Sequence, residues 1–318
     1  MNGKGAIWVL SAVLCAAGCG QQAAEPTAAL AEAGKPGAQV SGESALEEVR
    51  RFVALGPKEP GTAGAERAAA HLVARLREIG VEAEIQEFRD QTPVGERTFR
   101  NVLGRIPGAG GGILLLGSHY DTKTGIEGFE GANDSGSSTG LLIELARVLK
   151  RNGPHPLEIR FAFFDGEECW VEYGPGDGFH GSEHLAAAME VDGSLRRIAA
   201  MILLDMVGDG DLTITIPRNG TPGLIALAFE AARAEGVRKH FSLYPGHIRD
   251  DHMAFFRRGV PAVNLIDFCY GSAPGKNDYW HTAEDSMDKL SAESLEIVGR
   301  VAARMVEELL RREAAAEK

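Results

Sequence analysis

The stretch ILLLGSHYD, residues 113–121, decides the fold. An unbroken apolar run predicts a strand that is buried on both faces, because a strand with one wet face would alternate apolar and polar residues. Its apolar part ends at Gly117, and polar His119 and Asp121 follow at once. Three later runs are equally short, apolar and followed by polar residues: 159–164 (IRFAFF), 199–204 (AAMILL) and 262–266 (AVNLI).

Helical segments separate these runs. The sequence predicts such helices at 136–150, 182–189, 224–235 and 251–257, with a long amphipathic helix at 291–312 closing the chain. Buried strands that alternate with helices indicate a mostly parallel sheet covered on both faces. Ahead of this unit we expect helices at 45–55 and 63–79 and strands at 81–88 and 97–108. We therefore predict a single α/β domain of three layers, α/β/α.

The first residues are typical of an export signal. Lys4 precedes an apolar stretch over 6–17, which is too short to span a bilayer, and small residues lead to Cys19. AAGC at 16–19 resembles a bacterial lipobox, in which the cysteine is lipidated; plain secretion is the alternative. We expect a lipoprotein signal peptide at 1–18, a flexible Ala/Gly/Pro-rich tether at 19–44 and a catalytic domain at 45–318.

Charge and cysteine content limit the partners. A formal net charge of −12 without basic runs argues against nucleic acid or an anionic membrane as partner. Membrane contact is expected only through a lipidated Cys19, with the domain in the periplasm or at the cell surface. After removal of the signal, Cys169 and Cys269 remain, and their spacing leaves open whether they pair.

Residues suited to catalysis follow the predicted strands. Ligands bind at the carboxyl ends of strands in open α/β sheets, so these residues should gather in one place. Histidine and carboxylate side chains together are typical of a catalytic zinc site, and two adjacent glutamates can divide metal binding from general-base work. The candidates are His119, Asp134, Glu167, Glu168, Asp205 and His281.

Five motifs form a recognisable set. They are HYD (119–121), GANDSGSSTGLLIELAR (131–147), FFDGEE (163–168), LLDM (203–206) and WHT (280–282). This set resembles the zinc-aminopeptidase superfamily of metallo-exopeptidases. Three further features resemble the glutaminyl cyclases within it: the 12 residues between Glu168 and Gly181, the segment IRDDHMAFFRRGVPAVNLI (248–266), and Trp280-His281 with an acidic stretch downstream.

The resemblance implies roles for individual residues. It assigns Glu167 as the acid/base group, with Asp205 and Asp250 as its hydrogen-bond partners, and Trp280 and Tyr173 as walls of the substrate pocket. The implied zinc ligands are Asp134, Glu168 and His281.

Two departures from the family pattern stand out. Asn264 occupies a position where a histidine is expected, which puts the proton network in doubt. Ser118 and Thr139 replace the cysteine pair of animal cyclases, so this chain lacks only a covalent cross-link at these positions.

Three functions stay open at this point. The first is a glutaminyl-peptide cyclotransferase with one Zn²⁺, acting on peptide or protein N-termini. The second is an aminopeptidase with two metals, which would add His119 and Asp205 as ligands of a second ion. The third is a non-catalytic binding domain, which need not keep a full ligand set. The long segment after Glu168 and the aromatic residues favour the cyclase.

Overall fold

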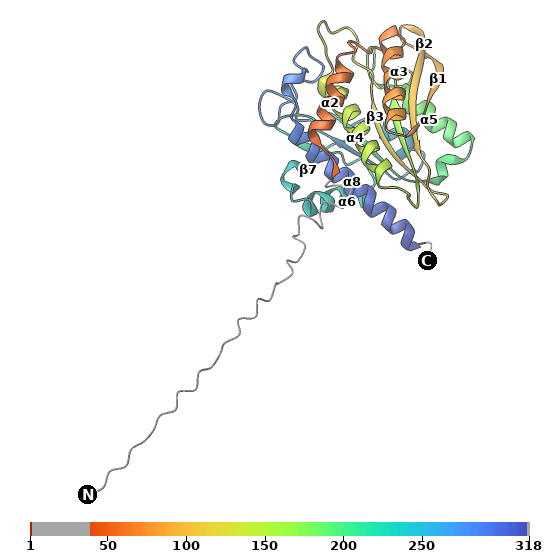
Figure 1. Cartoon of the computed structure of the whole chain (residues 1–318). Coiled ribbons are helices and arrows are strands. Elements are labelled where there is room, and N and C mark those ends of the chain that lie inside the picture. The colour runs from red at the N-terminus through yellow and green to blue at the C-terminus, as the bar shows by residue number, and fades with distance from the viewer. Residues whose placement is uncertain (2–38, 317–318) are drawn as a thin grey trace.

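The computed structural model describes Met1 and residues 39–316. Apart from Met1, the expected signal peptide at 1–18, the lipidated Cys19 and most of the expected tether lie outside the described residues. Among residues 39–316, no helix combines the length and apolar composition that a bilayer crossing requires. Figure 1 shows helices packed on both sides of one twisted sheet.

The sheet has the strand order β1-β2-β4-β3-β5-β8. β1 and β2 form an antiparallel hairpin, β2 pairs antiparallel with β4, and the remaining pairs are parallel. A separate small sheet pairs β6 with β7 in parallel. The strands are β1 (Glu82–Thr92), β2 (Gly95–Ile106), β3 (Ile113–His119), β4 (Glu158–Phe164), β5 (Ile198–Asp205), β6 (Ile214–Ile216), β7 (Phe241–Leu243) and β8 (Ala262–Ile266).

Helices connect these strands and cover the sheet. The α-helices are α2 (Gly42–Val53), α3 (Ala63–Glu78), α4 (Ser138–Arg151), α5 (His180–Val191), α6 (Pro222–Ala234), α7 (His252–Phe256) and α8 (Ala292–Ala316). Short helical turns are η2 (Ala132–Ser137), η3 (Ser194–Arg197), η4 (Arg238–His240) and η5 (Met287–Lys289).

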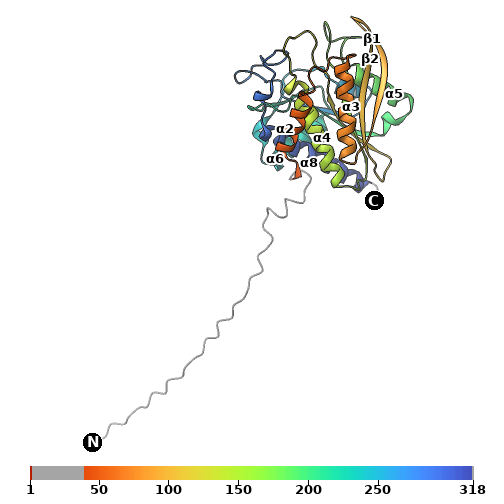
Figure 2. The ribbon, with the colours of Figure 1, turned by 45° about the horizontal axis from the view of Figure 1, so that its top comes forward.

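The alternating side chains of β3 show how the two faces are filled. Leu114 and Leu116 belong to the large core beneath α2, α3, α4 and α8, whereas Ile113 and Leu115 belong to a smaller core beneath α5 and α7. Figure 2 shows α2, α3 and α4 side by side over the first of these faces. Both faces of the parallel strands are therefore buried, which is the three-layer arrangement predicted from the apolar runs.

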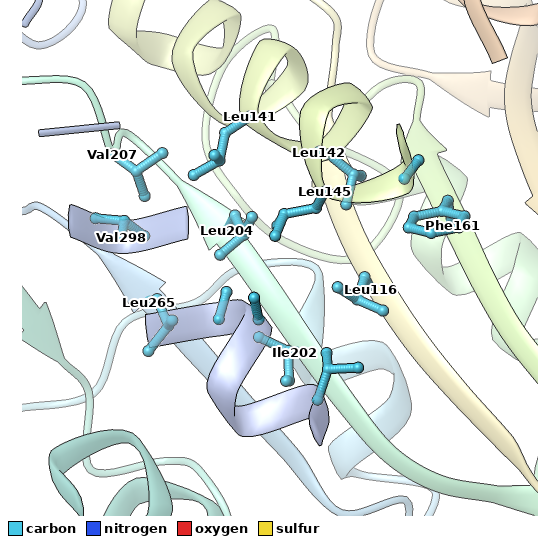
Figure 3. Close-up of a cluster of buried hydrophobic side chains, with 14 of the residues drawn as sticks. Leu116, Leu141, Leu142, Leu145, Phe161, Ile202, Leu204, Val207, Leu265 and Val298 are labelled. Carbon is cyan, nitrogen blue, oxygen red and sulfur yellow. The ribbon is translucent and has the colours of Figure 1, made fainter. Parts of the chain in front are cut away.

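The larger core lies between the sheet and helices α4 and α8. Figure 3 shows Leu141 and Leu145 of α4 directed towards Leu204 of β5, with Val298 of α8 close by. These side chains have almost no exposed surface. Burying a leucine of this kind contributes about 1.5–3 kcal/mol, so the core fixes the strand ends firmly.

The predicted α/β/α fold and its main elements are confirmed. Two details differ. The first helix begins at Gly42 with Ser41 as its cap, and Val40 is already buried, so packing starts before the expected domain boundary at 45. The β6–β7 sheet was not expected, because three-residue strands are too short to show a periodicity.

Gly140 allows α4 to approach α2 closely. A Cβ atom at this position would lie 2.5 Å from Val49 Cγ2 and 2.9 Å from the carbonyl oxygen of Ala45. We predict that Gly140→Ala lowers the free energy of unfolding by about 1–3 kcal/mol, because backbone atoms must move. Gly223→Ala in α6 is the control, since nothing lies within 4 Å of its added Cβ. Urea unfolding measures both; equal stability of the two variants would contradict the close approach.

Candidate active site

One cluster of possible ligands gathers where β3 and β5 end. His119 is the last residue of β3, and Asp205 is the last residue of β5. The Nε2 atom of His119 lies 3.0 Å from Asp134 Oδ1 and 3.3 Å from Asp205 Oδ1. All three side chains are buried. These three residues are close enough together to share one metal ion.

A second cluster shares Asp134 with the first. His281 Nε2 lies 3.3 Å from Asp134 Oδ2 and 3.2 Å from Glu168 Oε2, and these three residues are also close enough to hold one ion. The two oxygens of Asp134 therefore face different imidazoles. The structure brings together every metal ligand expected from the sequence, in two groups that meet at one carboxylate.

The electrostatics of the clusters fit a divalent cation. Burial opposes protonation of His281, but hydrogen bonds to Asp134 and Glu168 outweigh it and raise the pKa of His281 to about 9. Burial and the nearby Asp134 raise the pKa of Glu168. Among the described residues, Asp205 Oδ1 makes no hydrogen bond of good geometry, and His119 Nε2 approaches it only to 3.3 Å. Crowded carboxylates and imidazoles of this kind are suitable ligands for zinc, which would supply the missing positive charge.

Two further aspartates orient the clusters. Asp121 accepts hydrogen bonds from the backbone amides of Glu167 and Glu168, each at 3.1 Å. Asp285 accepts hydrogen bonds from the amide of Asn133 at 2.7 Å and that of Asp134 at 3.1 Å. Neither aspartate was assigned a role from the sequence, although Asp121 belongs to the HYD motif and Asp285 to the acidic stretch after His281.

Glu167 is the candidate acid/base group. Burial raises its pKa well above the ordinary value; the charge of His119 opposes this rise, and those of Glu168 and Asp250 add to it. Its side chain pairs with Tyr173, whose hydroxyl lies 3.1 Å from Glu167 Oε2 and 2.9 Å from Glu168 Oε2. A buried carboxyl of raised pKa is suited to accept and return a proton near neutral pH.

The two expected partners of Glu167 lie in the same cavity but bind other groups. Asp205 faces His119, while Asp250 Oδ2 accepts a hydrogen bond of 2.6 Å from Asn264 Nδ2. Within residues 39–316, no hydrogen bond joins Glu167 to Asp205 or Asp250. Asn264 thus takes up the polar contact to Asp250 at the position where a histidine was expected, although an amide cannot carry a proton as an imidazole can.

The cavity above these groups is small and partly aromatic. Its volume is about 190 Å³, below the 300–1,000 Å³ typical of pockets for drug-sized ligands. Tyr173 and Trp280 both line it, as expected, and the Trp280 ring stacks on His281 with centroids 3.9 Å apart. Four other lining residues were not assigned a role from the sequence: Tyr244, His247 and Phe268 lie in none of the motifs, and Arg249 lies in the segment 248–266 without a role assigned to it.

The two cysteines are unpaired in the structure. Cys169 is buried, and its thiol lies 3.1 Å from Lys123 Nζ. That ammonium also lies 3.6 Å from Glu168 Oε2. The sequence left the pairing of Cys169 with Cys269 open, and the structure shows both as free thiols.

Known proteins are similar to this chain in sequence. The sequence profile of peptidase family M28 matches residues 101–306. A glutaminyl-peptide cyclotransferase-like protein of Bos taurus is 32% identical over 282 residues, covering 80% of this chain and 72% of the bovine protein.

Solved structures are similar as well. A glutaminyl cyclase from an Acidobacteriales bacterium has a TM-score of 0.81 at 36% identity, covering 86% of this chain and 96% of that one. A Zn-dependent exopeptidase from Parabacteroides distasonis has a TM-score of 0.75 at 27% identity, covering 86% and 98%.

The hydroxyl of Tyr173 contacts both glutamates, so its role can be separated from that of its ring. We predict that Tyr173→Phe lowers kcat about tenfold on a peptide with N-terminal glutamine, the substrate that the motifs imply, with little change in KM. The loss of a hydrogen bond to a charged group has this size. Tyr244→Phe, in the same cavity, is the control. An equal, small effect of both variants would show that Tyr173 only lines the cavity with its ring and that its hydroxyl has no role in turnover.

Proposed function

Because the chain belongs to peptidase family M28 and, within it, to the glutaminyl-peptide cyclotransferases, we infer that it converts the N-terminal glutamine of peptides to pyroglutamate and releases ammonia. The observation that supports this best is the small cavity in which Glu167 lies beside a ligand cluster. A cyclase must fold one side chain back onto its own amine, and a small cavity favours that geometry.

We propose that Asp134, Glu168 and His281 hold one zinc ion. Their donor atoms, two carboxylates and an imidazole, match the ligands of a catalytic zinc site with an open position. When bound, zinc acts as a Lewis acid that polarises the side-chain carbonyl of the substrate glutamine. Asp121 and Asp285 would hold the backbone of these ligands in place through the amide hydrogen bonds described above.

Glu167 carries the proton in this proposal. Its carboxylate accepts a proton from the substrate α-amine as the amine nitrogen bonds to the side-chain carbonyl carbon. The bond between that carbon and the amide nitrogen then breaks, and Glu167 returns the proton to the departing nitrogen, which leaves as ammonia. One group can perform both steps because burial places its pKa above the ordinary range. The Tyr173 hydroxyl would orient the carboxyl group.

A two-metal aminopeptidase is the alternative, and one observation favours it. His119, Asp134 and Asp205 form a second group that is close enough to hold an ion. In this alternative Glu167 would instead deprotonate a water molecule for peptide hydrolysis. Charge repulsion among Asp134, Asp205 and Asp250 would be relieved by a second cation.

We further propose that the enzyme is exported and attached to a membrane through a lipid on Cys19. Lys4, the apolar stretch at 6–17 and the AAGC sequence support this proposal. A lipidated end would hold the domain at a membrane face, and the residues before α2 would give it reach.

The zinc ligands can be tested by metal content. We predict that His281→Ala and Glu168→Gln each lose bound zinc and activity together. His119→Ala should retain one zinc per chain if a single ion serves the cyclase, and should lose metal and activity if two ions are needed. His240→Ala, outside both clusters, is the control. Full zinc occupancy in both His281→Ala and Glu168→Gln would exclude this ligand set.

The reaction can be tested by mass spectrometry. We predict that purified enzyme removes one ammonia from Gln-Phe-Ala and leaves Leu-Phe-Ala intact. Glu167→Gln should keep its zinc and lose at least about 100-fold in turnover, because an amide cannot cycle a proton. Release of free leucine with no change in the glutamine peptide would instead establish the aminopeptidase.

A further inference from the structure

A second cavity lies beside the active-site cavity and shares one lining residue, Arg249, with it. Its volume is about 390 Å³. The segment between Glu168 and Gly181, here called the insertion loop (169–180), lines both: Tyr173 faces the first cavity, and Gly174 and Gly176 face the second. Arg249 also lines both cavities. A peptide that leaves the first cavity on the side of Arg249 would pass next to the second.

The other charged groups of the second cavity already have partners. Asp90 Oδ2 lies 2.8 Å from His180 Nδ1. Glu183 binds Arg257, and it also accepts a hydrogen bond of 2.8 Å from Arg258. Their charges are thus compensated within the protein.

Arg249 differs from these groups. It is exposed, and in the part of the chain that the structure describes it forms no ion pair and no side-chain hydrogen bond. A guanidinium with free donors is suited to bind a carboxylate through two parallel hydrogen bonds. The boundary between the two cavities therefore carries an uncompensated positive charge.

The position of Arg249 relates this charge to the substrate. In the proposed function, the amine and side chain of the terminal glutamine lie beside Glu167, so the rest of the peptide must leave by the mouth of the cavity. Asp134, Glu167, Asp205 and Asp250 make the interior acidic, and the chain as a whole has a net charge of −12. The acidic interior and the negative net charge would each disfavour binding of a negatively charged peptide unless a nearby cationic side chain binds its acidic group.

We propose that Arg249 binds an acidic side chain at one of the positions directly after the N-terminal glutamine, and that the enzyme prefers such peptides. The proposal rests on the proposed function, since it concerns the substrate of the same site. A rim contact of this kind acts mainly on binding, so the preference belongs to KM rather than to kcat.

The test compares peptides that differ only in charge. Gln-Glu-Ala-Phe and Gln-Ala-Glu-Phe are measured against the same peptides with glutamine or lysine in place of glutamate, at a pH where glutamate is ionised. We expect kcat/KM to be about threefold higher for at least one glutamate peptide than for its neutral partner, as exposed ion pairs predict. The preference should disappear in about 1 M NaCl, where the screening length is only about 3 Å.

Variants assign the preference to one residue. Arg249→Gln should reduce the ratio of glutamate to neutral peptide to about one, and Arg249→Glu should invert it in favour of lysine. Arg196→Ala removes an exposed arginine just before the amino end of β5, whereas the active site lies at the carboxyl end, and it should leave the ratio unchanged.

The possible failures are distinct. Cyclisation of every peptide at the same rate in the wild type, or an acidic preference that survives Arg249→Gln, would overturn the role of Arg249 while leaving the cyclase intact. The absence of ammonia release from any glutamine peptide would instead overturn the proposed function.

Discussion

The site depends on the placement of one carboxylate, Asp134, between two imidazoles. Its Oδ1 faces His119 and its Oδ2 faces His281, at 3.0 and 3.3 Å. Each imidazole comes from a different part of the chain, one from the end of β3 and one from the loop after β8. Burial alone would raise the pKa of Asp134, yet these contacts outweigh burial and lower it. Both imidazoles therefore favour the ionised form of this carboxylate.

Holding those neighbours requires the rigid sheet. Buried carboxyl groups repel one another, and burial raises the pKa of Glu167, Asp205 and Asp250. Such an arrangement is costly unless a cation or a shared proton compensates it. The strands tolerate this repulsion because apolar packing on both faces fixes their ends. In addition, the turn η2, which contains Asp134, leads into α4, and both elements contact α2 and β5.

The sequence could predict those parts of the fold and site that depend on local pattern. His119 and Asp205 end apolar runs, so their meeting follows from parallel strands, and the motifs supplied Asp134, Glu168 and His281. Asp285 could not be assigned, because its role is to accept amide hydrogen bonds from residues far away in sequence. Arg249 lies in the segment 248–266 that resembles the cyclases, but the resemblance assigns it no role, and only the folded chain places it beside two cavities.

The insertion loop shows how a segment without secondary structure can still be fixed in place. The carboxylate of Asp177 accepts hydrogen bonds from three consecutive amides, those of Trp170, Val171 and Glu172, at 2.6–2.9 Å. Gly178 has a φ of +86°, and a Cβ atom there would lie 2.7 Å from the ring of Tyr173.

Both features hold the loop that carries Tyr173, whose hydroxyl contacts Glu167 and Glu168 at 3.1 and 2.9 Å. The segment after Glu168 therefore places a hydroxyl in direct contact with the candidate acid/base group and with a candidate metal ligand.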